Sequence, residues 1–154
     1  MNPFSIADFL YDKMFYEIGY GFDECLRTGN FGPYLHEIIQ KTTCFPHAAA
    51  VYLIAKAAGL KPTLYSACGM KDVAEGIPAE SVARMDHSFI ICHLRKNVKW
   101  LVDPLMGLKG RVHFNEGHIE VFDTYERKLH TRHYDTLTAL DEKSIVDKLE
   151  ELHI

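Results

Sequence analysis

Three residues of this chain, in the order Cys44, His87 and Asp103, have the types and settings that nucleophilic catalysis requires. Cys44 stands where a helix is expected to begin, in the segment TTCFPHA. His87 opens an expected strand, DHSFII, and Asp103 ends the next one, KWLVDP. A thiolate beside a histidine attacks carbonyl carbon, while a carboxylate holds the histidine in the required tautomer. The order and the settings predict a Cys-His-Asp triad that transfers acyl groups.

The expected setting of Cys44 also favours the thiolate. A free cysteine has a pKa of about 8.5, so little thiolate is present at neutral pH. The N-terminus of a helix adds unpaired N–H groups and about half a positive charge. An imidazolium from His87 would add an ion pair and would later protonate the leaving amine. We therefore expect the pKa of Cys44 to be lowered.

Two further side chains are candidates for the site. The backbone N–H of Cys44 is one expected oxyanion donor, and the side chain of Gln40 is a candidate for the second. An exposed helical glutamine would fit the same pattern. His47 lies one turn after Cys44 and is expected at the surface or at the rim of a cleft, where it could tune the thiol or contact substrate.

The helix that carries Cys44 is expected over residues 44–58. Pro46 suits its first turn and Gly59 suits a left-handed stop. Small and apolar residues share a face with the cysteine, namely Ala48, Val51 and Ala55. This face would let the helix lie close to a sheet, with Cys44 at the end of the buried stripe.

His87 and Asp103 are expected on a hairpin whose strands span residues 87–94 and 98–102. Both strands are apolar on both faces, which predicts central positions in the sheet. The two side chains share a face only if the numbers of paired residues sum to an even number. The triad hypothesis therefore requires an odd-length hairpin loop or a bulge.

A three-residue loop would pair Leu94 with Val98. Asp103 would then lie opposite Phe89 and diagonal to His87, within reach of a hydrogen bond. A two-residue turn without a bulge would instead send Asp103 to the other face of the sheet.

The rest of the chain predicts a single α+β domain over residues 1–154. It comprises helices within 1–43, a core over 44–125 in which the helix at 44–58 packs on a mostly antiparallel sheet, and a C-terminal helix at about 141–152 capped by Asp141. Within the core we expect a short strand at 63–67, a long loop at 68–84 that could cover a cleft, and a hairpin of residues 111–114 and 118–122.

Composition and charge give no reason to expect several classes of protein and partner. The net charge of −4 gives no reason to expect nucleic acid or an anionic membrane as a partner. No signal peptide and no apolar run of membrane-spanning length is recognisable, so we expect a cytoplasmic protein. The four cysteines are spaced as free thiols, with Cys68 and Cys92 expected to be buried. The oligomeric state stays open.

Neither a metal nor a cofactor is expected. Cys44 and His47 form one close pair, and His130 and His133 form another. Zinc needs three or four converging ligands, and neither pair has a partner at the spacing of a structural site.

The segment CFPHAAAVYLIAKAAGLKP, followed by DHSFII and VKWLVDP, resembles the transglutaminase-like superfamily of papain-fold enzymes. In that family a cysteine begins a helix of small residues, a histidine begins a strand, and Asp-Pro ends the next strand. The resemblance spans about residues 40–107 and implies Cys44 as the nucleophile, His87 as the base and Asp103 as the orienting acid. Phe45 departs from the glycine or acidic residue that often follows the family's cysteine, and Phe89 stands where tryptophan is commoner.

The expected function is a peptidase or amidase acting on a peptide or protein amide, since the chain is short for a cross-linking enzyme. A transglutaminase or a protein deamidase would use the same triad. A non-catalytic transglutaminase-like interaction module and a metal-binding or redox-sensing protein are further alternatives. The residues do not decide whether water or an amine attacks the thioester.

Overall fold

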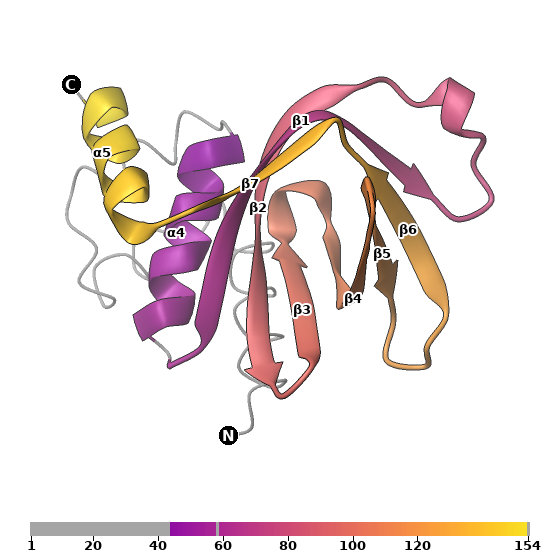
Figure 1. Ribbon diagram of the computed structural model, residues 1–154, viewed down its shortest axis with the longest axis horizontal. Helices are drawn as coiled ribbons and strands as arrows, with labels where there is room; N and C mark the ends of the chain where they lie inside the picture. Colours follow the sequence, from indigo (N-terminus) through magenta and orange to yellow (C-terminus); the bar gives the residue numbers. More distant parts are fainter. Residues whose placement is uncertain (1–43, 58, 154) are drawn as a thin grey trace.

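The computed structural model describes residues 44–57 and 59–153 (Figure 1). The helices expected within residues 1–43 and the candidate Gln40 lie outside the described residues. The described part is α+β, with two α-helices and a seven-stranded sheet whose neighbouring strands are all antiparallel. The expected fold class is confirmed at this level.

The elements follow one another in the order α4 (Cys44–Ala57), β1 (Lys61–Ala74), η1 (Ala79–Ser81), β2 (Met85–Arg95), β3 (Val98–Asp103), η2 (Pro104–Met106), β4 (Leu108–Asn115), β5 (His118–Phe122), β6 (Lys128–His133), β7 (Thr136–Leu140) and α5 (Glu142–His153). Gly59, with φ +86°, ends α4 in the left-handed conformation as expected. Asp141 caps α5 by accepting the Ser144 N–H at 2.7 Å, which confirms the predicted cap.

The sheet closes on itself through the long strand β1. Residues 61–67 of β1 pair with β2, and residues 64–68 pair with β7 on the opposite side. Residues 71–74 pair with β6. Since β2, β3, β4, β5 and β6 pair in sequence, strands β1 to β6 form a closed ring and β7 is added outside it. The strands of the ring can be followed in Figure 1.

The prediction of a long loop at residues 68–84 is wrong for the first half of this segment, because β1 continues to Ala74. The register shifts between Ala67 and Met70, and Gly69 lies at φ +64°. A glycine inside a strand often marks a bulge, and a bulge bends the strand. Beyond this point the partner of β1 on one edge changes from β7 to β6, while Met70 still pairs with Met85 of β2.

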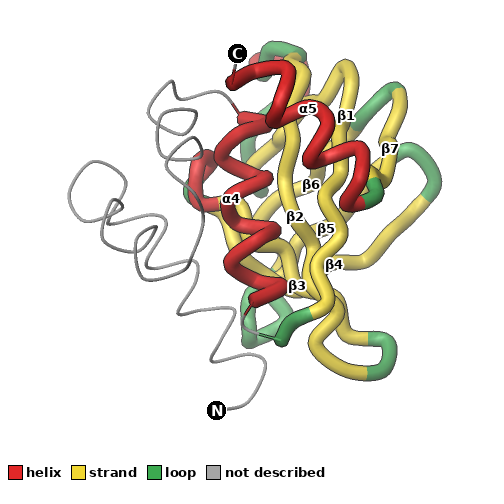
Figure 2. Tube along the Cα trace, turned by 90° about the vertical axis from the view of Figure 1, so that its left-hand side faces the viewer, coloured by secondary structure: helices red, strands yellow, loops and turns green. Residues whose placement is uncertain are grey.

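Two apolar clusters form the core. Both helices lie on one side of the closed sheet (Figure 2), and α4 packs on the outer faces of β1 and β2. The second cluster draws on strands β1 to β5 and fills the interior of the ring. Side chains alternate between the two: Ile90 faces α4, whereas Phe89 and Ile91 face inward. The ring therefore has an enclosed interior in which polar groups need partners.

The β2–β3 hairpin meets the register condition of the triad. Ile90 pairs with Val102 and Ile91 with Leu101, which sets Asp103 opposite Phe89 as expected. A bulge between His93 and Arg95 supplies the required extra residue. The expected pairing of Leu94 with Val98 is wrong, because Arg95 takes that position across a two-residue turn.

The sheet also extends past residue 125, since β6 and β7 complete it. Cys92 is buried as expected, whereas Cys68 is exposed because it lies at the β1 bulge. None of the helices in the described part of the chain has both the length and the apolar character needed to cross a membrane.

Candidate active site

Cys44 is the first residue of α4, where the helix presents its unpaired N–H groups. The residue is half-buried, and its Sγ lies 3.9 Å from the carbonyl oxygen of Asp86. Asp86 directly precedes His87 in β2, so this contact brings the start of the helix to the start of the strand. The two elements are far apart in sequence and meet at this point.

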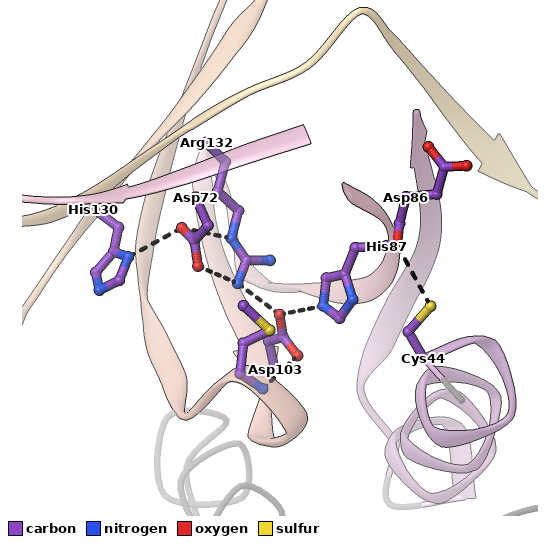
Figure 3. Close-up of polar contacts among 8 residues, drawn as sticks. Cys44, Asp72, Asp86, His87, Asp103, His130 and Arg132 are labelled. Carbon is purple, nitrogen blue, oxygen red and sulfur yellow. Dashed lines mark hydrogen bonds and ion pairs between the residues drawn. The ribbon is translucent and has the colours of Figure 1, made fainter. Parts of the chain in front are cut away.

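His87 and Asp103 both point into the closed ring from neighbouring strands. His87 Nε2 lies 2.8 Å from Asp103 Oδ2, and the two side chains are only 3% and 2% exposed. Figure 3 shows the His87 ring between Asp103 on one side and Cys44 on the other. Since Nε2 is engaged by the carboxylate, Nδ1 is the ring nitrogen left for the thiol. The three residues named from sequence are thus brought together.

The electrostatics of this arrangement favour an ion pair between thiolate and imidazolium. A hydrogen bond from His87 lowers the pKa of Cys44, although burial acts in the opposite direction. Burial likewise disfavours the charged imidazole, but hydrogen bonds to Asp103 and Cys44 outweigh it and raise the pKa of His87 to about 9. With a pKa of about 9, the His87 imidazole is protonated at neutral pH, and the lowered pKa of Cys44 favours the thiolate beside it.

Asp103 is ionised despite its burial. Burial tends to raise its pKa, but the charge of Arg132 and the hydrogen bond with His87 lower it to about 2. Arg132 Nη2 lies 2.6 Å from Asp103 Oδ2, and the backbone N–H of Met106 donates to Oδ1 at 3.4 Å. The carboxylate consequently accepts hydrogen bonds at both oxygens and serves as a fixed negative charge behind His87.

Arg132 and its partner Asp72 were not anticipated from the sequence. Arg132 projects from β6 and is 0% exposed, with Nε 3.2 Å from Asp72 Oδ1. His130 Nδ1 also lies 3.0 Å from Asp72 Oδ1. Figure 3 shows this group continuing the line from Cys44 through His87 and Asp103. The strand β6, KLHTRH, has no apolar alternation that would predict a buried strand, and Asp72 is distant in sequence.

His47 differs from its expected position. It is buried, with 5% of its side chain exposed, because residues 46–52 of α4 are buried on every side. Burial lowers its pKa to about 4, so the imidazole is neutral at physiological pH. Its Nε2 has no hydrogen-bond partner among the described residues. The prediction that His47 lies at the surface or at the rim of a cleft is therefore wrong, and its burial gives no support to a direct contact with substrate.

The histidine pairs do not assemble a metal site in the described part of the chain. No group of three or more His, Cys, Asp or Glu residues there could hold a metal ion. His130 binds Asp72, whereas His133 packs against His118 with ring centroids 5.6 Å apart. Residues three apart on a strand point to opposite faces, which separates His130 from His133.

Comparisons with protein-family models, with curated proteins and with solved structures gave no match for this chain. What these side chains do is therefore inferred from their own geometry and electrostatics.

Proposed function

We propose that this protein is a cysteine-dependent acyl-transfer enzyme that cleaves amide bonds, with Cys44 as nucleophile, His87 as acid and base, and Asp103 as the orienting carboxylate. The observation that carries the proposal is the buried His87 ring, bonded to Asp103 at 2.8 Å and interacting with a Cys44 thiol whose pKa it lowers. The resemblance of the same three segments to the transglutaminase-like superfamily supports this assignment.

The chemistry follows from the positions of the groups. The Cys44 thiolate attacks the carbonyl carbon of the amide, and the backbone N–H at the start of α4 stabilises the oxyanion. The C–N bond breaks as His87 gives its proton to the departing amine, leaving a thioester on Cys44. Water then attacks the thioester while neutral His87 accepts its proton, which releases a carboxylic acid and restores the thiolate–imidazolium pair.

The first test measures the reactivity of Cys44. Iodoacetamide alkylation is followed from acid to mildly basic pH, and mass spectrometry of peptides separates Cys44 from the exposed Cys68, which serves as the internal reference. We expect a midpoint for Cys44 below the free-thiol value of about 8.5, because the hydrogen bond from His87 lowers its pKa, and loss of that depression in His87→Ala. His93→Ala removes an exposed histidine from the same strand and should leave the midpoint unchanged.

A midpoint near about 8.5 in the wild type, unchanged in His87→Ala, would reject the catalytic proposal and leave a non-catalytic module. If the thiol is activated, peptide amides are supplied with and without a primary amine. Release of acid alone identifies a hydrolase, whereas incorporation of the amine identifies a transglutaminase. Cys44→Ala must abolish either product.

A further inference from the structure

The Asp103 carboxylate has two cationic neighbours, and both reach the same oxygen. His87 Nε2 lies 2.8 Å and Arg132 Nη2 lies 2.6 Å from Oδ2. The other oxygen, Oδ1, accepts the Met106 N–H. Charge-assisted hydrogen bonds are shorter and stronger than neutral ones, and they are directional. The orientation of Asp103 is therefore determined by its hydrogen bond with Arg132 as well as by its hydrogen bond with His87.

Arg132 is itself held in place on two sides. Asp72 faces it with Oδ1 3.2 Å from Nε and Oδ2 3.3 Å from Nη2. The guanidinium carbon lies 4.9 Å from the centre of the Phe89 ring, which contributes a cation–π contact. A planar guanidinium bound by two carboxylates and stacked on a ring has little freedom to turn. A guanidinium fixed in this way restricts the orientation of the Asp103 carboxylate that it binds.

Packing alone does not explain an arginine at this position. The side chain is 0% exposed in the polar end of an otherwise apolar interior. Burying a guanidinium carries a large desolvation cost, and an apolar residue of similar volume would often stabilise a fold at least as well. The feature that an apolar residue could not reproduce is the contact with the carboxylate that supports His87.

We propose that Arg132 is a positioning residue of this site: clamped by Asp72, it holds the Asp103 carboxylate in the orientation that receives the Nε2–H of His87. This inference rests on the proposed function. Arg132 acts through Asp103 and does not touch substrate.

The charges predict what happens when Arg132 is removed. Asp72, Arg132 and Asp103 together present one net negative charge to His87. Without Arg132, two buried carboxylates would share the same region, and such a pair cannot readily stay fully ionised. The charge of Arg132 itself slightly disfavours the imidazolium, but the stabilisation by Asp103 is larger, and an Asp103 that takes up a proton or turns away no longer provides it. The Cys44 thiolate then loses its partner, and the midpoint of its alkylation rises.

The test compares Arg132→Gln, Arg132→Lys and Asp72→Asn by the pH profile of Cys44 alkylation, on samples whose near-ultraviolet circular dichroism shows a folded protein. Arg132→Gln should raise the midpoint by about one unit, which slows alkylation about tenfold below the midpoint. Arg132→Lys should lie between this variant and the wild type, and Asp72→Asn should cause a loss of about threefold. Arg127→Gln removes an exposed arginine that pairs with Asp123 and should have no effect.

A merely structural Arg132 would give a different pattern. Arg132→Gln would then melt at a lower temperature while its folded fraction kept the wild-type midpoint, and that result would overturn the inference. If Arg132→Gln does not fold, Asp72→Asn decides, and an unchanged midpoint overturns the inference equally. Failure of the proposed function is distinct, because the wild type itself would then show no depressed midpoint.

Discussion

His87 is held between opposing influences. Its burial alone would lower the pKa, whereas the hydrogen bonds to Asp103 and Cys44, together with the charge of Asp103, raise it to about 9. Phe89 cannot replace them, because its ring stacks 6.0 Å from the imidazole and is neutral. The charged state of His87 therefore depends on both polar partners, and losing either one should let burial prevail.

Asp103→Asn tests this balance directly. The amide keeps the shape of the carboxylate but not its charge, so the pKa of His87 should fall from about 9 to below its ordinary value of 6.5. The pKa of His87 is followed by the NMR shift of its ring Cε1–Hε1 group. Amide turnover, once a substrate is found, should drop by about 100-fold or more, the scale of a lost acid–base catalyst.

Asp147→Asn provides the control, because Asp147 pairs with Lys143 on the surface of α5. A His87 pKa that stays near 9 in Asp103→Asn would contradict the role given to Asp103, since burial would then have failed to prevail.

The helix α4 contributes more than the position of its first residue. It is buried on all sides over residues 46–52. A second histidine in this buried stretch, His47, interacts electrostatically with His87 and Asp103. Because burial holds the pKa of His47 near 4, this histidine stays neutral and adds no competing positive charge beside His87. The helix thus supplies a thiol at its end and a neutral imidazole one turn later.

The burial of His47 predicts how stability responds to acid. Its pKa is about 4 in the folded protein and 6.5 when exposed, so the unfolded chain binds the proton more readily between these values. His47 therefore causes no loss of stability above pH 6.5, and the free energy of unfolding falls as pH drops from 6.5 toward 4. This single group accounts for a loss on the order of 3 kcal/mol.

The measurement is urea unfolding at several pH values across this window. His47→Gln cannot titrate, so the difference in stability between the variant and the wild type should shift in favour of the variant as the pH falls. His93→Gln removes an exposed histidine and should leave the slope as it is. Parallel pH profiles for the wild type and His47→Gln would show that His47 is not buried in solution.

Local patterns predicted the elements that carry Cys44, His87 and Asp103, and long-range contacts account for what they missed. Pro46, Gly59 and the small residues between them indicated α4, and parity along β2 and β3 required an odd-length loop or a bulge, of which the hairpin contains a bulge. Arg132 lies on a strand of mixed polar residues, and its burial depends on Asp72 and Asp103, which other strands supply. The residue spacing within one segment cannot predict the contacts of Arg132 with Asp72 and Asp103, because these contacts form only when the sheet closes.

Closure of the whole sheet depends on one irregular position in β1. Gly69 lies at φ +64°, and its N–H donates to Asp86 Oδ1 at 3.1 Å while its carbonyl accepts from Arg84 at 2.7 Å. Arg84 also binds Asp135, the residue directly before β7. The bulge therefore joins the two halves of β1 and fixes the residue that precedes His87.

Gly69→Ala should damage the fold and the site together. A side chain at this φ costs about 1–2 kcal/mol, and a Cβ here would also overlap the Asp135 carboxylate. Gly76→Ala is the matched control, because Gly76 has φ +85° in the turn that follows β1 but open space around its missing Cβ. We expect urea unfolding to show a loss of about 1 kcal/mol for Gly76→Ala and about 3 kcal/mol for Gly69→Ala. Only Gly69→Ala should also raise the midpoint of Cys44 alkylation, since only Gly69 binds Asp86. Equal losses in the two variants, with no change at Cys44, would mean that the bulge bends β1 without supporting the site.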